Sequence, residues 1–227
     1  MKNSSIPRAT LLIIFLGLIL TINNCKKQED SVSDINGNVY KTTRIGTQTW
    51  MTENLKTTRL NDGTYISLVP DNWSLYTQPS YCWYNNDSTI NKDTYGALYN
   101  FYAVSSNKLC PKGWHVPSNN EWSTLMTYLV DSLASGKLRE SGTIHWTSPN
   151  KGANNSSGFN ALPGGMRGFG GQFYGINTNG YWWSSTEAMA GFTMGGLSLG
   201  LYWLGNGQLR DAYDYRSGLS VRCVQDN

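Results

Sequence analysis

Residues 110–122 read CPKGWHVPSNNEW, and this stretch decides the fold. Ser118 can cap a helix through its hydroxyl, and Glu121 can reach back to the backbone N–H of the cap, so the two residues predict a capping box. The spacing of the apolar residues that follow predicts an amphipathic helix that ends near Gly136 and covers a core with one face. These apolar residues are Trp122, Leu125, Met126, Leu129 and Leu133.

The N-terminus has the features of a secretory signal. Two basic residues precede an apolar run over residues 9–22, which is shorter than the roughly 20 residues needed to span a bilayer. Cys25 follows this run and resembles the lipobox cysteine of bacterial lipoproteins, which carries the lipid after the signal is cut. We therefore expect residues 1–24 to be removed and the protein to be exported and lipid-anchored through Cys25 to the bacterial outer membrane or cell surface. A permanent transmembrane segment is the alternative.

The composition is typical of a loop-rich, strand-containing domain. Hydrophobic residues make up 39% of the 227 residues and charged ones 15%, with 24 Gly, 14 Tyr and 9 Trp. Residues 25–36 are polar and predict a tether, so the domain should span residues 37–227. Without its signal the chain has a net charge of about +1. Because nucleic-acid binders are strongly basic, nucleic acid is not an expected partner.

Three cysteines remain if Cys25 is acylated. Cys223 lies in the last predicted strand, and a disulfide to Cys110 would tie the first part of the core to the C-terminus. Closing so long a loop stabilises a fold by roughly 4–5 kcal/mol in the chain-entropy model. Cys82 would then be a free or buried thiol. The alternative is that all three are reduced core residues.

The remaining pattern predicts further elements of a single α+β domain. Residues 38–64 predict an opening hairpin, residues 71–91 a long ordered loop, and Thr94 the start of a second helix. Beyond Gly136, glycine-rich turns separate short strands. The clearest inward alternation is formed by Leu197, Leu199, Leu201 and Trp203.

Sequence motifs for catalysis are missing. Residues 164–171, GGMRGFGG, lack the Gly-Lys-Ser/Thr of a phosphate loop, and no Gly-x-Ser-x-Gly elbow is present. Neither His115 nor His145 stands at metal-ligand spacing from a cysteine or carboxylate. We therefore expect no catalytic residue, no metal site and no cofactor, while a structural calcium ion stays open.

Aromatic, amide and arginine side chains gather near the C-terminus. Rigid rings interleaved with such groups suit ligand binding because they offer contact area at low entropy cost. Some of these rings could instead be core, Trp182 or Trp183 in particular. The predicted ligand surface, for a glycan or a protein, consists of Tyr181, Tyr202, Trp203, Asn206, Gln208, Arg210, Tyr213 and Tyr215.

Six segments stand in a fixed order: IGTQTWMTENLKTTRLNDGT, YCWYNNDSTINKDTYGALYNFYAV, CPKGWHVPSNNEW, GFNALPGGMRG, YWWSSTE and GLSVRCV. Together they resemble the Fibrobacter succinogenes major paralogous domain family of exported bacterial proteins. WHVPSNNEW and SVRC are also similar to pieces of the formylglycine-generating sulfatase-modifying enzymes, whose fold is a variant of the C-type-lectin-like fold. The resemblance implies a single C-type-lectin-like domain with two helices, short antiparallel strands, long ordered loops, and pairing between its N- and C-terminal strands.

Function does not follow from such a fold. The formylglycine-generating enzymes rely on a pair of cysteines near the C-terminus, where this chain has only Cys223, and the sugar-binding motifs of calcium-dependent lectins are absent. We expect a lipid-anchored envelope module that binds a glycan or a protein and is not an enzyme. The alternatives are an oxidoreductase-like enzyme on a formylglycine-generating scaffold and a structural envelope protein.

Overall fold

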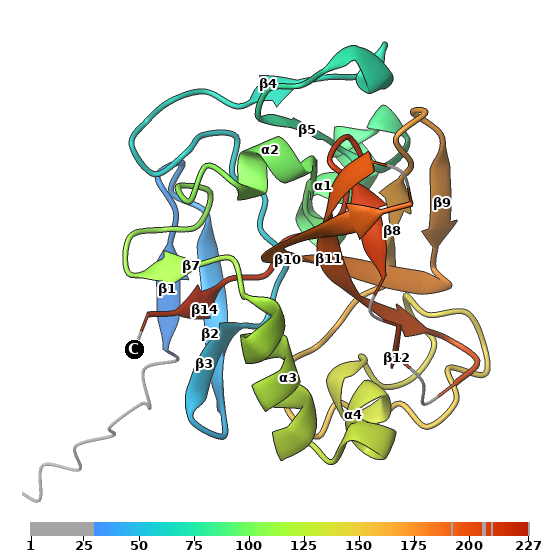
Figure 1. Ribbon diagram of the computed structural model, residues 1–227. Coiled ribbons are helices and arrows are strands. Elements are labelled where there is room, and N and C mark those ends of the chain that lie inside the picture. The colour runs from blue at the N-terminus through green and yellow to red at the C-terminus, as the bar shows by residue number, and fades with distance from the viewer. Residues whose placement is uncertain (1–29, 192, 206–207, 210, 227) are drawn as a thin grey trace, which may run out of the picture.

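The structure is a computed structural model that describes residues 30–191, 193–205, 208–209 and 211–226. This part of the chain has a mixed α+β fold with three curled, mainly antiparallel sheets and a few short helices (Figure 1). No helix within it is long and apolar enough to cross a membrane.

The predicted opening hairpin is present. Strands β2 (Val39–Ile45) and β3 (Gln48–Met51) pair in antiparallel fashion across a two-residue turn. Gly46 opens this turn with a φ of 63°, a backbone conformation that glycine adopts without strain. Strand β1 (Ser31–Ser33) pairs with β2, so the folded region begins before Gly37 and includes residues that the sequence assigned to the tether.

The two ends of the domain meet in one five-stranded sheet, in the order β1-β2-β3-β14-β7. The C-terminal strand β14 (Val224–Gln225) lies between β3 and β7 (Trp114–His115), as Figure 1 shows. A disulfide joins Cys110 to Cys223 with an S–S distance of 2.02 Å, which confirms the predicted pairing. The described cysteine outside this bond, Cys82, is free and buried.

A second, larger sheet is built around the long hairpin β10–β11. In β11, Leu199 and Leu201 are fully buried, and Trp203, just after the strand, packs against the same cluster, which confirms the prediction at these three positions. Leu197, the fourth residue of the predicted alternation, is only half-buried. The strands of this sheet are β8 (Gly164–Arg167), β9 (Phe173–Ile176), β10 (Asn179–Ala190), β11 (Thr193–Tyr202), β12 (Gln208–Leu209) and β13 (Ala212–Asp214).

A third, small sheet contradicts part of the predicted loop. Its strands are β4 (Ser67–Leu68), β5 (Ser80–Cys82) and β6 (Leu98–Tyr99). Two 3-10 turns, Trp73–Leu75 and Tyr84–Asn86, also fall in the segment expected to be a loop. The aromatic residues of this segment are largely buried, so they form local structure against the core although they show no periodicity.

The capping box is confirmed, but the helix behind it is shorter than predicted. Helix α3 (Asn119–Tyr128) starts at Ser118, whose hydroxyl accepts from the Glu121 N–H at 3.3 Å while the Glu121 carboxylate accepts from the Ser118 N–H at 2.8 Å. Val130 has a φ of 65° and ends the helical path, and α4 (Asp131–Leu138) starts a new direction. Leu133 is consequently 51% exposed instead of lying in the core.

The predicted helix from Thr94 is wrong. Helix α1 (Ser88–Tyr95) instead ends there, because Gly96 at a φ of 73° stops it, and the side chain of Asp87 caps its first turn. A short helix α2 (Phe101–Val104), capped by the Asn100 side chain, follows β6.

The sheets and helices enclose two main hydrophobic clusters. Trp183 belongs to the first cluster, with the disulfide, and Trp182 to the second, beside Trp50, Trp122 and Phe159. Both tryptophans of the YWWSSTE segment are therefore core residues, as the alternative interpretation of these rings anticipated.

Candidate functional site

Three residues of the predicted ligand surface form a tyrosine cluster, which we define as Tyr181, Tyr202 and Tyr213. The ring of Tyr181 stands edge-on to the other two, with centroid distances of 5.9 Å to Tyr202 and 5.8 Å to Tyr213. Gly200 on β11 leaves the room for this arrangement, since a Cβ there would lie 3.0 Å from the Tyr202 hydroxyl. Strands β10, β11 and β13 therefore bring these tyrosines together on one face.

The tyrosine cluster is largely occupied with internal contacts. Tyr181 is only 8% exposed, and its hydroxyl accepts from the Asn179 side chain at 3.0 Å. Burial raises the pKa values of Tyr202 and Tyr213, and the neighbouring Tyr181 hydroxyl adds to both shifts. Both phenols stay protonated at physiological pH, so neither is suited to act as a general base.

The other predicted surface residues do not join this cluster. Tyr215 stacks on Phe101 with a centroid distance of 4.8 Å, and Trp203 packs against the second hydrophobic cluster on the opposite face of the sheet. Asn206, Arg210 and the side chain of Gln208 lie outside the described part of the chain, as does the predicted lipid-bearing Cys25. The use of this surface for a ligand remains a prediction.

A different region forms a pocket of about 1350 Å³, which we call the polar pocket. It is lined by residues of all five strands of the first sheet together with Gly158 and Asn160. Hydroxyl, amide and charged side chains dominate its wall, and Trp114 adds one aromatic ring. The lining residues are Asp30, Ser31, Val32, Lys41, Thr42, Thr43, Arg44, Thr49, Thr52, Trp114, Gly158, Asn160 and Gln225.

Pairing of distant segments assembles the polar pocket. The register places Arg44 opposite Thr49 across the hairpin, and Gln225 opposite Trp114 at the other side of the sheet. Trp114 is partly buried because it packs against the first hydrophobic cluster, which holds its ring in place. Hydroxyls, amides and a fixed aromatic ring are the groups that hold a polar ligand with one apolar face, such as a sugar.

The polar pocket was not predicted from the sequence. Arg44 and Thr42 do alternate with Thr43 and Ile45 along β2, which is a signal for one solvated face. Nothing local to Trp114, however, indicates that the C-terminal strand pairs beside it. The pocket exists only after this non-local pairing.

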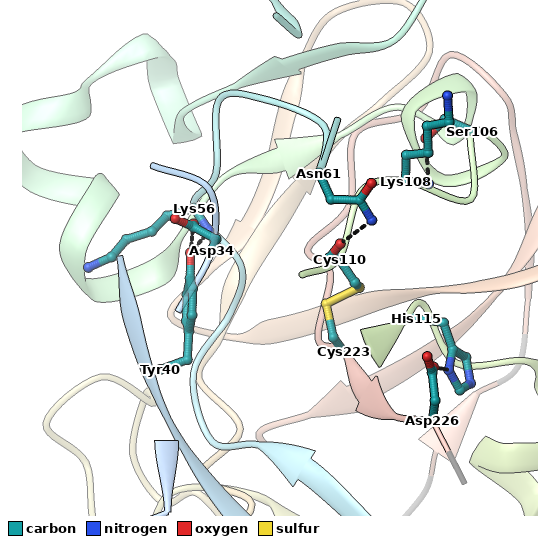
Figure 2. Close-up of a disulfide and its surroundings, with 10 residues drawn as sticks. All are labelled: Asp34, Tyr40, Lys56, Asn61, Ser106, Lys108, Cys110, His115, Cys223 and Asp226. Carbon is teal, nitrogen blue, oxygen red and sulfur yellow. Dashed lines mark hydrogen bonds and ion pairs between the residues drawn. A yellow bond between two sulfur atoms is a disulfide. The ribbon is translucent and has the colours of Figure 1, made fainter. Parts of the chain in front are cut away.

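Both histidines bind carboxylates that the sequence spacing did not reveal. His115 lies between Asp226, at 2.6 Å from Nδ1, and Glu121, at 2.7 Å from Nε2, and Figure 2 shows the contact with Asp226 near the disulfide. His145 contacts Glu140 at 2.8 Å. Within the described residues no group of three or more His, Cys, Asp or Glu is arranged to hold a metal ion.

The His115 contacts connect the end of the chain to the start of α3. Burial lowers the pKa of His115, but the hydrogen bonds to Asp226 and Glu121 outweigh it and raise the pKa above its ordinary value. The Glu121 carboxylate is held by the Ser118 N–H and hydroxyl as well as by His115. This arrangement is a network of paired charges that fastens β7, β14 and α3 together.

The fold and these sites define a disulfide-closed α+β domain whose N- and C-terminal strands share a sheet and shape a polar pocket. The family model of the Fibrobacter succinogenes major domain matches residues 43–225, and the chain belongs to this family. No curated protein and no solved structure matches the chain.

Proposed function

We propose that this protein is a lipid-anchored binding module of the bacterial cell envelope that recognises a glycan through the polar pocket. The observation that carries the proposal is the lining of this pocket, where four threonines, Asn160, Gln225 and the partly buried Trp114 border one cavity of about 1350 Å³. Sugars present hydroxyl groups for hydrogen bonds and an apolar ring face for stacking, so both kinds of group have a use there.

The sequence supports the anchoring. The apolar segment over residues 9–22, the lipobox-like Cys25 and the polar residues after it favour export, cleavage and acylation, and the disulfide suits an oxidising compartment. The membrane is then a partner through the lipid, and the domain stands close to the outer membrane or cell surface.

We also propose that the domain is a C-type-lectin-like relative of the sulfatase-modifying enzymes. Support comes from the WHVPSNNEW and SVRC segments and from the antiparallel pairing of β14 with β3. A thiol oxidase on this scaffold is less well supported. Cys110 and Cys223 are bonded to each other, and burial raises the pKa of Cys82 to about 12, which disfavours the reactive thiolate.

A glycan array probed with the detergent-solubilised full chain tests the proposal. We expect binding to a subset of glycans, and we expect Gln225→Ala to weaken it several-fold because Gln225 is exposed and lines the pocket. Trp114→Phe should weaken binding too, with the melting temperature checked because Trp114 also packs against the core. An array on which the protein binds no glycan at all would overturn the proposal.

The tyrosine cluster supplies a second candidate surface for the same function, since Tyr202 and Tyr213 keep partly exposed rings. Tyr213→Leu tests it in the same array. Loss of binding in this variant, with Gln225→Ala unchanged, would move the ligand from the polar pocket to the tyrosine cluster.

A further inference from the structure

Arg44 is the charged group of the polar pocket with the most donor capacity left for a ligand. Its Nε donates to the Gly46 carbonyl at 3.3 Å, which bends the side chain back along the hairpin turn. Among the described residues, no hydrogen bond or ion pair engages its two Nη groups. Arg44 is an exposed residue of the pocket lining, so the two Nη groups of its guanidinium fork are left for a ligand.

The charges of the lining favour an anion. Arg44 and Lys41 are its cationic residues, and Asp30 is its carboxylate. Two further carboxylates, Asp226 just after β14 and Glu121 in α3, are both hydrogen-bonded to His115, so their charge is partly compensated. The cationic side of the pocket lies on β2, where Arg44 pairs in register with Thr49.

We propose that the polar pocket takes an acidic glycan, with the carboxylate or sulfate of a sugar residue on the Arg44 guanidinium. This inference rests on the proposed glycan-binding function. A guanidinium presents two parallel N–H donors that match the two oxygens of a carboxylate or a sulfate, and such bidentate pairs are stronger than neutral hydrogen bonds. The threonine hydroxyls and the Asn160 and Gln225 amides then hold the neutral hydroxyls of neighbouring sugars.

Affinity gel electrophoresis of the full chain in detergent tests the proposal against defined polymers. Polygalacturonate supplies carboxylates, dextran sulfate supplies sulfates, and unmodified dextran and xylan supply neutral chains. We expect retardation by at least one acidic polymer, with a dissociation constant about tenfold tighter than for the neutral ones, the scale of one charge-assisted hydrogen bond. Which acidic polymer binds distinguishes carboxylate from sulfate.

Two arginine variants and a matched control assign the effect to the fork. Arg44→Gln should weaken binding to the acidic polymer about tenfold and leave neutral binding unchanged. Arg44→Lys keeps the charge but loses the bidentate geometry, so its affinity for the acidic polymer should lie between that of the parent protein and that of Arg44→Gln. Lys151→Gln removes one positive charge from an exposed side chain outside the pocket and should have no effect.

The outcomes separate this inference from the function on which it rests. Equal binding to acidic and neutral polymers, weakened by Gln225→Ala, would overturn the acidic preference and leave glycan binding in place. An equal loss of affinity for the acidic polymer in Arg44→Gln and Lys151→Gln would show attraction by net charge alone. This result would also overturn the assignment of the acidic sugar to Arg44. Failure to bind any polymer here, together with an empty glycan array, would overturn both.

Discussion

At the scale of single residues, His115 gives the domain a pH-dependent contribution to stability. Its raised pKa means that the contacts with Glu121 and Asp226 stabilise the fold fully below the ordinary value of 6.5 and lose this effect as the pH rises through the raised value. His115→Gln should therefore lower the free energy of unfolding by about 1 kcal/mol near pH 6, a size set by the partial exposure of the pair, and by less at alkaline pH.

Urea denaturation near pH 6 and at alkaline pH measures this difference. Glu121 contributes to stability with the opposite pH dependence. Because its pKa is lowered, its contribution is present above pH 4.5 and is lost as the pH falls through the lowered value. Glu121→Gln keeps an acceptor for the Ser118 N–H but removes the charge opposite His115, so a double-mutant cycle isolates the pair. An identical loss for His115→Gln at acidic and alkaline pH would contradict the assignment.

Arg222 illustrates a different use of a charged residue, because its side chain is fully buried. It donates to the Asn54 amide oxygen at 2.9 Å and to the Phe159 carbonyl, and its guanidinium lies 4.2 Å from the Phe159 ring centroid. Burial lowers its pKa to about 9. Its guanidinium also lies 5.9 Å from the ring centroid of Trp182 in β10, so the residue holds the C-terminal segment against β10 and the loop that carries Phe159.

Arg222→Ala should reduce the free energy of unfolding by about 3–4 kcal/mol, since it leaves a cavity and takes away the donor to the Phe159 carbonyl, while the Asn54 oxygen keeps the Trp182 N–H. Arg222→Met retains most of the side-chain volume and should cost roughly half as much. Chemical denaturation of the two variants measures the difference. An Arg222→Ala variant as stable as the parent would show that the buried contacts contribute nothing net.

At the scale of elements, the junction between α3 and α4 stores strain. Val130 has a φ of 65°, which is unfavourable for a β-branched residue, and its side chain is 56% exposed, so little packing compensates. Val130→Gly should therefore raise the free energy of unfolding by about 0.5–1 kcal/mol. Val39, which is 58% exposed in β2, provides the matched control, because Val39→Gly should destabilise a strand. Thermal unfolding of both variants checks the opposite signs.

The same junction shows which part of an element a sequence can predict. The start of α3 depends on Ser118 and Glu121, a local pair, and was predicted correctly. Its end depends on the conformation of Val130, which no local signal indicates, since Leu129 and Leu133 continue the helical spacing. Gly96 is the reverse case, because this glycine is a local stop signal and α1 ends just before it, at the position where the sequence predicts a helix start from Thr94. Local chemistry fixes caps, whereas tertiary packing decides where a helix bends.

At the scale of the whole molecule, the disulfide was predictable and the polar pocket was not. Cys110 opens the segment with the capping box and Cys223 lies in the last predicted strand, so the sequence indicates a core element at each. With four cysteines in the chain, few disulfide partners were available to either. The polar pocket instead needs the register of Gln225 against Trp114 and of Arg44 against Thr49 at the same time. Such non-local pairings leave no mark in the spacing of either segment. The ligand surface predicted from the sequence consequently contains aromatic residues that pack, in large part, against the rest of the fold.

The four cysteines allow one measurement that tests the disulfide and the anchor together. With Cys110 bonded to Cys223 and Cys25 carrying a thioether-linked lipid, only the buried Cys82 thiol is left. We expect a thiol reagent to label one cysteine per mature chain in denaturant before reduction and three after it, and none rapidly in the folded protein. A second label before reduction would place a free thiol at Cys25 and contradict the lipid anchor.

The stability of the closed chain completes this test, because the bond spans 113 residues. A loop of that length should stabilise the fold by about 4–5 kcal/mol in the chain-entropy model, so replacing Cys110 and Cys223 together by Ala should lower the unfolding midpoint in urea strongly. Reductant should shift the parent protein in the same direction and leave the double variant unchanged. Cys82→Ala provides the control, since its melting curve should keep its sensitivity to reductant. If the urea unfolding midpoint of the parent protein were the same with and without reductant, the Cys110–Cys223 bond would contribute no stability.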